Sequence, residues 1–238
     1  MAEAEKIPRA WGWATPRALF SSMRPRQWTK NLIIYFAFFF TVDQAWQLQD
    51  IGEATRLFTR ATIAFVLFCL VTSAVYLIND VIDAEKDRRH PEKRYRPIAA
   101  GALSPALALG MAFLMASGSL AVASALNPIF ALAVLVYFVV MIAYSTCLKR
   151  IVILDVFTIS AGFVLRAVAG AVILGVSISP WLYICTSLGA LFLGFAKRLN
   201  EAVLTGEEGG LQRETLDDYN PKFLEQLIAI VAPATLVS

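Results

Sequence analysis

Long apolar runs, separated by short polar or charged stretches, dominate the chain. A helix that spans a bilayer needs about 20 mostly apolar residues, and seven segments approach or reach that length. They cover residues 28–42, 57–78, 102–126, 128–148, 151–175, 180–196 and 223–238. The runs are too long and too uninterrupted for strands. The pattern therefore predicts an all-α fold, a polytopic transmembrane helix bundle of about seven helices in a single domain over residues 1–238.

The two ends of the chain are the least regular parts of this pattern. The first run is short, although Trp28 and Trp46 are candidate interfacial anchors. The last run ends with the chain at IAIVAPATLVS, so we expect a truncated last helix and further helices beyond it. The N-terminal stretch has mixed charges, two prolines and no cleavage site after its apolar run, which is not typical of a signal peptide.

Composition supports a membrane protein and excludes some alternatives. The chain is 58% hydrophobic and 16% charged, with a mean hydropathy of +0.63, whereas about a quarter of an average soluble domain is charged. The net charge of +3 is too small to indicate a nucleic-acid partner. The three cysteines lie in or beside apolar runs without CxxC spacing, so we interpret them as packing residues.

The basic residues predict the orientation. If residues 1–27 are a cytoplasmic segment, alternate connections face the cytoplasm, and 18 of the 21 Lys and Arg residues lie on that side or within three residues of it. Only Arg56 and Arg60 lie on the opposite side, and Arg166 lies inside an apolar run. Because cytoplasmic loops carry the excess of Lys and Arg, we expect an integral inner-membrane protein with a cytoplasmic N-terminus and active site.

The stretch NDVIDAEKDRRHPEKRYRP, residues 79–97, places carboxylates where an apolar run ends. If the helix continues, Asp80, Asp83 and Asp87 share one face, with Asn79 beside it. Carboxylates this close repel each other unless a cation or enough water lies between them. Oxygen ligands suit Mg²⁺, which commonly binds one or two carboxylates together with substrate phosphates. The alternative is a solvated helix end with mixed charges.

Basic side chains follow the acidic cluster and could bind phosphate oxygens. They include Arg88, Lys93 and Arg96, and together with the carboxylates they predict a magnesium–diphosphate site. His90 precedes Pro91, which breaks the helix. This histidine either donates to a phosphate or caps the loop.

Polar residues in or near other apolar runs are further candidates. Arg166 lies within an apolar run, where an arginine indicates function, although a structural role as a partner for backbone carbonyls or another helix is the alternative. Asp155 lies eleven residues earlier on nearly the same helix face, about 16 Å away, which is too far to pair with it. It could orient a basic residue, contact a ribose hydroxyl or simply form an ion pair. Lys30 either snorkels to the interface or binds substrate, and the neighbouring Asn31 favours a polar role.

Helix ends supply the remaining candidates. Tyr76 and Tyr144 lie at ends that should line the site, or they belong to an interfacial belt. The candidate cations of the later connections and their acidic neighbour are Lys149, Lys197, Arg198 and Glu201. Glu201 could simply form an ion pair with Lys197 four residues before it.

The stretch NDVIDAEKDRRHPEKRYRPIAAG resembles the NDxxDxxxD and RPxxxG signature of the UbiA superfamily of intramembrane prenyltransferases. The resemblance implies that Asn79, Asp80, Asp83 and Asp87 bind Mg²⁺ and a diphosphate. Three further stretches resemble the decaprenyl-phosphate phosphoribosyltransferase branch of this superfamily. They are MRPRQWTKN, HPEKRYRP and YSTCLKRIVILDVFTISAGFVLRAVAG. The start of that first stretch contributes Arg24. The second DxxxD motif of aromatic prenyltransferases is absent from the stretch AKRLNEAVLTGEEGGLQRETLDDYNPKFL, which we expect to be a loop.

The resemblance implies a Mg²⁺-dependent transfer of 5-phosphoribosyl from phosphoribosyl diphosphate to a polyprenyl phosphate in the lipid bilayer. Two alternatives remain open. One is a prenyltransferase that uses a polyprenyl diphosphate and an aromatic or isoprenoid acceptor, against which the missing DxxxD counts. The other is a transporter, which would need polar residues spread through its helices. An oligomer is compatible with the sequence.

Overall fold

The computed structural model describes residues 14–43, 45–47, 49–177, 180–208 and 221–237, most of which are helical. Among these residues, five helices are long and apolar enough to cross a membrane, judged by length and composition. They are α3 (Ile51–Ile82), α5 (Pro105–Leu126), α6 (Pro128–Thr146), α7 (Leu154–Leu174) and α8 (Pro180–Glu208). The other elements are α1 (Ala14–Ser22), η1 (Pro25–Tyr35), α2 (Phe36–Phe39), α4 (Ala84–Arg89), η2 (Lys93–Tyr95), η3 (Leu148–Arg150) and α9 (Pro221–Val237), where η marks a 3₁₀ helix. The predicted all-α bundle is confirmed.

Local sequence signals account for the helix ends. Ser104 caps the N-terminus of α5 by accepting from the amide of Leu107, and Asn127 caps α6 in the same way. Each cap is followed by a proline, whose missing N–H costs nothing in the first turn. Gly175 ends α7 with φ +72°, a left-handed conformation that glycine adopts without a steric penalty.

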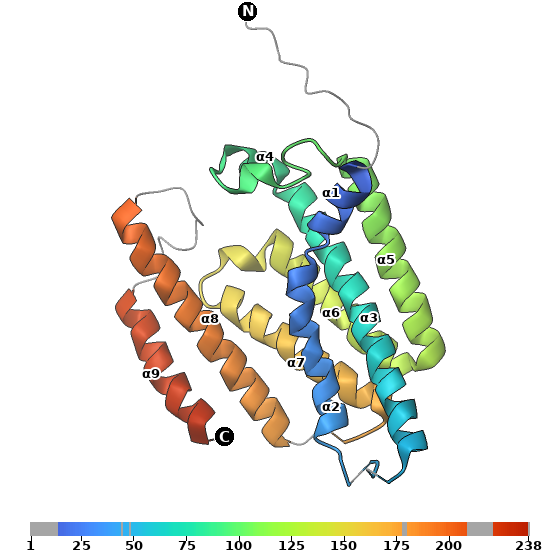
Figure 1. The fold of residues 1–238 in the computed structure, drawn as a ribbon. Coiled ribbons are helices and arrows are strands. Elements are labelled where there is room, and N and C mark those ends of the chain that lie inside the picture. The colour runs from blue at the N-terminus through green and yellow to red at the C-terminus, as the bar shows by residue number, and fades with distance from the viewer. Residues whose placement is uncertain (1–13, 44, 48, 178–179, 209–220, 238) are drawn as a thin grey trace, which may run out of the picture.

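Successive long helices run in alternate directions (Figure 1). The chain ascends in α3, α6 and α8 and descends in α5, α7 and α9, so α4, η2 and η3 gather at one end of the bundle together with the start of η1. This is the end that carries the basic connections. The connections rich in Lys and Arg therefore lie together at one end of the bundle. The assignment of that end to the cytoplasm stays a prediction.

The first apolar run differs from the expected α-helix. It forms an eleven-residue 3₁₀ helix, η1, followed by the four residues of α2, although 3₁₀ runs longer than three or four residues are uncommon. Tertiary contacts hold it. A Cβ on Gly170 of α7 would lie 2.3 Å from the Ile34 carbonyl oxygen, so only glycine lets the two backbones approach this closely. Trp28 also donates to Ser73 Oγ of α3 at 3.1 Å.

Helix α8 differs from expectation at its C-terminal end. It continues past Ala196 to Glu208, so Lys197, Arg198 and Glu201 lie on a helix where a loop was expected. Uninterrupted helix-forming residues such as Leu199 and Ala202 allow the extension. Asp217 and Asp218, the adjacent aspartates of the stretch that lacks a DxxxD motif, lie outside the described residues.

The central core lies between η1, α2, α3, α6 and α7. Its largest buried side chains include Phe68, Phe130 and Tyr137. A second cluster joins α3 to α1 and α5, and a third joins α7 and α8 to α9 around Phe195 and Leu224. The central helices therefore form a packed frame that carries polar groups at one end.

Candidate active site

The acidic motif lies where α3 gives way to α4. The expectation that one helix continues through all three aspartates is wrong, because α3 ends at Ile82, Asp83 is its C-cap, and α4 begins at Ala84. The amide of Asp83 still donates to the Asn79 carbonyl at 2.9 Å, and that of Asp87 to the Asp83 carbonyl at 2.8 Å. The interruption is therefore confined to Asp83, and the three carboxylates stay at one end of the bundle.

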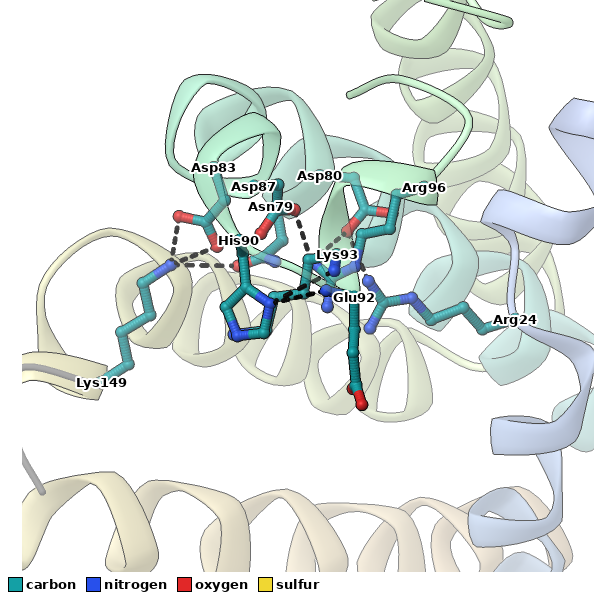
Figure 2. Close-up of polar contacts among 10 residues, drawn as sticks. All are labelled: Arg24, Asn79, Asp80, Asp83, Asp87, His90, Glu92, Lys93, Arg96 and Lys149. Atoms are coloured by element: carbon teal, nitrogen blue, oxygen red, sulfur yellow. Dashed lines mark hydrogen bonds and ion pairs between the residues drawn. The ribbon is translucent and has the colours of Figure 1, made fainter. Parts of the chain in front are cut away.

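Asp80 and Asp87 are buried and share a basic partner. Arg96 Nη1 lies 2.6 Å from Asp87 Oδ2 and 3.4 Å from Asp80 Oδ1. Arg24, from the start of η1, also forms an ion pair with Asp80 (Figure 2). Its guanidinium lies over the Tyr76 ring, 4.8 Å from the centroid. Segments far apart in the sequence thus meet at the two carboxylates.

Asp83 points toward a different segment. Lys149 Nζ of η3 lies 2.7 Å from both of its carboxylate oxygens and 3.4 Å from Asn79 Oδ1 (Figure 2). Lys149 therefore bridges Asp83 and Asn79 of the acidic motif.

The acidic motif offers ligands that suit a hard divalent cation. Asn79, Asp80, Asp83 and Asp87 present amide and carboxylate oxygens, the atoms that Mg²⁺ prefers. Within the described ranges, no three His, Cys, Asp or Glu side chains already converge as a metal cluster. The repulsion between the carboxylates is offset by arginine and lysine side chains of the same chain. The oxygen ligands of the motif therefore fit a divalent cation. In the structure, the carboxylates are paired with arginine and lysine side chains of the chain itself.

The loop after α4 places its basic residues differently from one another. Arg88 donates to the Ala99 carbonyl at 3.3 Å and pairs with Glu85 at 2.9 Å, away from the three aspartates. His90 Nδ1 accepts from the amides of Glu92 and Lys93, at 3.2 and 3.3 Å, which caps the loop. Desolvation, and next the charge of Lys93, lower the pKa of His90 and favour the neutral ring that can accept there.

Arg166 lies at the centre of a buried polar network. Its Nε donates to Asn31 Oδ1 at 2.7 Å, its Nη1 to the Gly162 carbonyl at 2.8 Å, and its Nη2 to Tyr137 Oη at 2.6 Å. Its side chain is buried, and all three partners are neutral. In the described part of the chain, no carboxylate lies within ion-pair distance of this guanidinium. A full positive charge is thus held inside the bundle by neutral acceptors.

Tyr137 is a residue of this network that the sequence analysis missed. Besides accepting from Arg166, its hydroxyl lies 3.4 Å from Thr72 Oγ1. A signal for it existed, because Tyr137 precedes Tyr144 by seven residues and so shares its face of α6. Cys69, interpreted as a packing residue, accepts from Asn31 Nδ2 at 3.3 Å.

A second ion-pair cluster joins α7 to α8. Arg198 Nε donates to Asp155 Oδ2 at 2.7 Å, and its Nη1 pairs with Glu201. Asp155 and Arg198 are both buried. Lys197 is exposed and lies 3.7 Å from Glu201. Asp155 therefore forms a buried ion pair with Arg198, which is the plain ion pair among the alternatives, and it does not pair with Arg166.

An apolar cavity of about 650 Å³ lies next to the buried arginine. It is bounded by η1, α2, α7 and α8, and its lining includes Ile33, Phe163 and Gly189. Phe163 also lies against Arg166, whose guanidinium carbon is 5.3 Å from the ring centroid. Lys30 is exposed and lies on η1, three residues before Ile33 and next to Asn31, which contacts Arg166. A positively charged region thus adjoins an apolar space.

Together these features define a multi-pass membrane protein with an acidic, arginine- and lysine-lined site at one end of its helices. The chain belongs to the UbiA prenyltransferase family, whose model matches residues 38–201. It is accordingly an integral membrane protein.

Curated relatives support a narrower similarity. The chain is 36% identical to a decaprenyl-phosphate phosphoribosyltransferase of Mycolicibacterium smegmatis, over 92% of this chain and 68% of that protein. It is 35% identical to proteins of the same name from Corynebacterium glutamicum and Mycobacterium tuberculosis, covering 92% and 91% of this chain. The chain spans 65% and 70% of the length of those two relatives.

Solved structures support the fold. A UbiA homolog from Archaeoglobus fulgidus bound to DMAPP and Mg²⁺ matches with a TM-score of 0.75 and 21% identity, over 92% of this chain and 75% of that one. A digeranylgeranylglyceryl phosphate synthase matches with a TM-score of 0.67 and 15% identity, over 93% of this chain and 77% of that one. The bundle is therefore of the UbiA type.

Proposed function

We propose that this chain carries the site of a membrane phosphoribosyltransferase. It would transfer 5-phosphoribosyl from phosphoribosyl diphosphate to a polyprenyl phosphate and release diphosphate, with a divalent cation, preferably Mg²⁺. Relatives with this name match most of the chain at 35–36% identity. The observation that carries the proposal is the meeting of Asp80, Asp83 and Asp87 with basic residues from three segments at one end of the bundle.

The diphosphate of the donor would bind at the acidic motif. Asn79 and the three aspartates would hold the divalent ion, which on binding neutralises the diphosphate and makes it a better leaving group. Arg24, Arg96 and Lys149 already lie at the same carboxylates and can turn donors toward phosphate oxygens. We place this end of the bundle in the cytoplasm, where a soluble sugar diphosphate could reach it.

The lipid acceptor would bind beside the diphosphate site, next to Lys30, Arg166 and the apolar cavity. Its phosphate could pair with two positive charges, those of Lys30 and the buried Arg166. The cavity beside Phe163 could receive part of the polyprenyl tail. A buried cation without a carboxylate partner gains most from an anionic ligand in a medium of low dielectric.

The reaction needs no strong base at this site. The bond between the anomeric carbon of ribose and the diphosphate oxygen breaks, and its electron pair leaves with the diphosphate. A phosphate oxygen of the lipid supplies the electron pair of the new bond to the anomeric carbon, and it is already ionised at neutral pH. The side chains therefore act by binding two anions close together and by stabilising the leaving group.

Labelled donor tests the proposal directly. Membranes that contain the protein, a polyprenyl phosphate and radiolabelled phosphoribosyl diphosphate should give labelled lipid when Mg²⁺ is present and none when it is chelated. Label that fails to appear in a folded protein, with transfer instead from a polyprenyl diphosphate, would refute the proposed donor. That outcome would favour the second candidate function, prenyl transfer, for which the fold similarity to a homolog bound to DMAPP speaks.

The cavity makes a separate prediction about the lipid tail. Gly189 lines it, and a Cβ there would meet nothing within 4 Å, so Gly189→Phe should fill the space without a clash. Transfer to a long-chain lipid phosphate should fall roughly tenfold or more, and transfer to a short-chain analogue should change much less. The matched control is Gly118→Phe on an exposed face of α5. Equal rates for the two variants on the long lipid would contradict this placement.

A further inference from the structure

The Lys149 ammonium lies at the point where oxygens of the acidic motif converge. It is equidistant, at 2.7 Å, from the two carboxylate oxygens of Asp83, and 3.4 Å from Asn79 Oδ1. The side chains of Lys149 and Asp83 are 15% and 22% exposed, so the pair is largely removed from water. This ammonium therefore holds the position that a metal ion bound by the same oxygens would need.

A metal ion and the ammonium would compete for these oxygens. Mg²⁺ binds oxygen at about 2.0–2.1 Å, which leaves no room for an ammonium on both oxygens of the same carboxylate. Two cations only a few ångströms apart also repel each other strongly where water is scarce. Metal binding through Asp83 thus requires Lys149 to move.

Asp83 is the carboxylate at which this competition matters most. The side chains of Asp80 and Asp87 are only 3% and 5% exposed and are held by guanidinium groups. Asp83 is the most accessible of the three and is held by a lysine. Lysine carries a point charge on a flexible four-carbon stem, so its ammonium can move several ångströms without a change in the backbone.

We propose that Lys149 is the resident cation of this site and makes metal binding depend on diphosphate. A bare divalent ion has to displace the ammonium from Asp83. A metal ion that arrives with diphosphate brings anionic oxygens to which the ammonium can transfer. The inference deepens the proposed function and rests on its metal–diphosphate site. In this account Lys149 is a positioning residue that keeps Asp83 closed to free metal ions and open to the metal-bound donor.

Manganese binding in detergent solution tests the inference without any turnover. Free Mn²⁺ is measured by electron paramagnetic resonance with wild type and Lys149→Met, each with and without inorganic diphosphate. Lys149→Met should bind Mn²⁺ alone about tenfold more tightly than wild type, since no ion pair has to be broken. Diphosphate should strengthen Mn²⁺ binding clearly in wild type and much less in the variant. Arg150→Met, which removes the neighbouring exposed cation, should behave like wild type.

The opposite results would overturn the inference. They are unchanged or weaker Mn²⁺ binding in a folded Lys149→Met protein, an equal gain in Arg150→Met, or no Mn²⁺ binding by any protein with or without diphosphate. Lys149→Gln is the second variant if Lys149→Met fails to elute as a folded protein. The proposed donor is tested separately by lipid labelling. Tighter Mn²⁺ binding in Lys149→Met with no labelled lipid would keep this inference and refute the donor.

Discussion

Asp83→Asn should lower phosphoribosyl transfer to lipid by at least about a hundredfold, because even the residues that support a metal ligand contribute 10–100-fold. Asparagine keeps the size of the side chain and one oxygen but removes the negative charge that would attract the metal ion. It also leaves the Lys149 ammonium facing a neutral group. The measurement is the initial rate of label incorporation into extracted lipid, with protein amount and elution profile matched to wild type.

Glu85→Gln provides the matched control for this loss of charge. Glu85 lies two residues away on α4 but is exposed and pairs with Arg88 and Arg89 on the surface. Exposed ion pairs contribute little to stability, so this variant should keep nearly the full rate. If Asp83→Asn retained more than about a tenth of the wild-type rate, binding of the metal ion through Asp83 would be wrong.

Arg166→Met should remove most of the activity while the protein remains folded. The methionine preserves apolar packing and eliminates the buried charge that we expect to bind the lipid phosphate. Three acceptors, on Asn31, Tyr137 and the Gly162 carbonyl, lose a donor. Loss of the cost of burying the charge offsets part of that effect on stability. We expect a rate at least about a hundredfold lower, mainly through weaker binding of the lipid phosphate.

Tyr137→Phe separates structure from charge at the same network. It removes the hydroxyl that accepts from Arg166 and lies near Thr72, but it keeps the guanidinium in place. The variant should lose about 1–3 kcal/mol of stability, the cost of leaving a buried donor unsatisfied, and only a small part of the activity. The measurement is the melting temperature and the transfer rate of Arg166→Met and of Tyr137→Phe, which separates a catalytic role of Arg166 from a structural one. Parallel losses in the two measurements would mean that Arg166 is only structural.

The fold could be predicted to a large extent from local patterns. Apolar runs of helical length, Ser104 and Asn127 as caps, and Gly175 as a stop are all signals within a few residues of the feature they specify. The errors fall where distant contacts override those signals. The 3₁₀ form of η1 accompanies the close approach of Ile34 to Gly170 of α7. The sequence of residues 25–35 alone does not predict that contact.

The candidate site shows the same division. The acidic motif and the basic residues around it are visible in the chain as a short pattern. Their partners are not, because Lys149 and Asp83 are 66 positions apart and Arg24 and Asp80 are 56 apart. The interruption at Asp83 could not be predicted because the residues on both sides are compatible with a continuous helix, and its contact with Lys149 joins two distant segments.

The sequence by itself determined that this protein is a bundle of membrane helices with an acidic motif at one end, and it placed the protein near one branch of a family. It could do so because the length of an apolar run and the spacing of a motif are local properties of the chain. Only the tertiary structure decided which cation faces which carboxylate. It also decided that Arg166 meets Asn31 across 135 positions, and that an apolar cavity opens beside them. Those outcomes depend on how helices distant in the chain pack against one another.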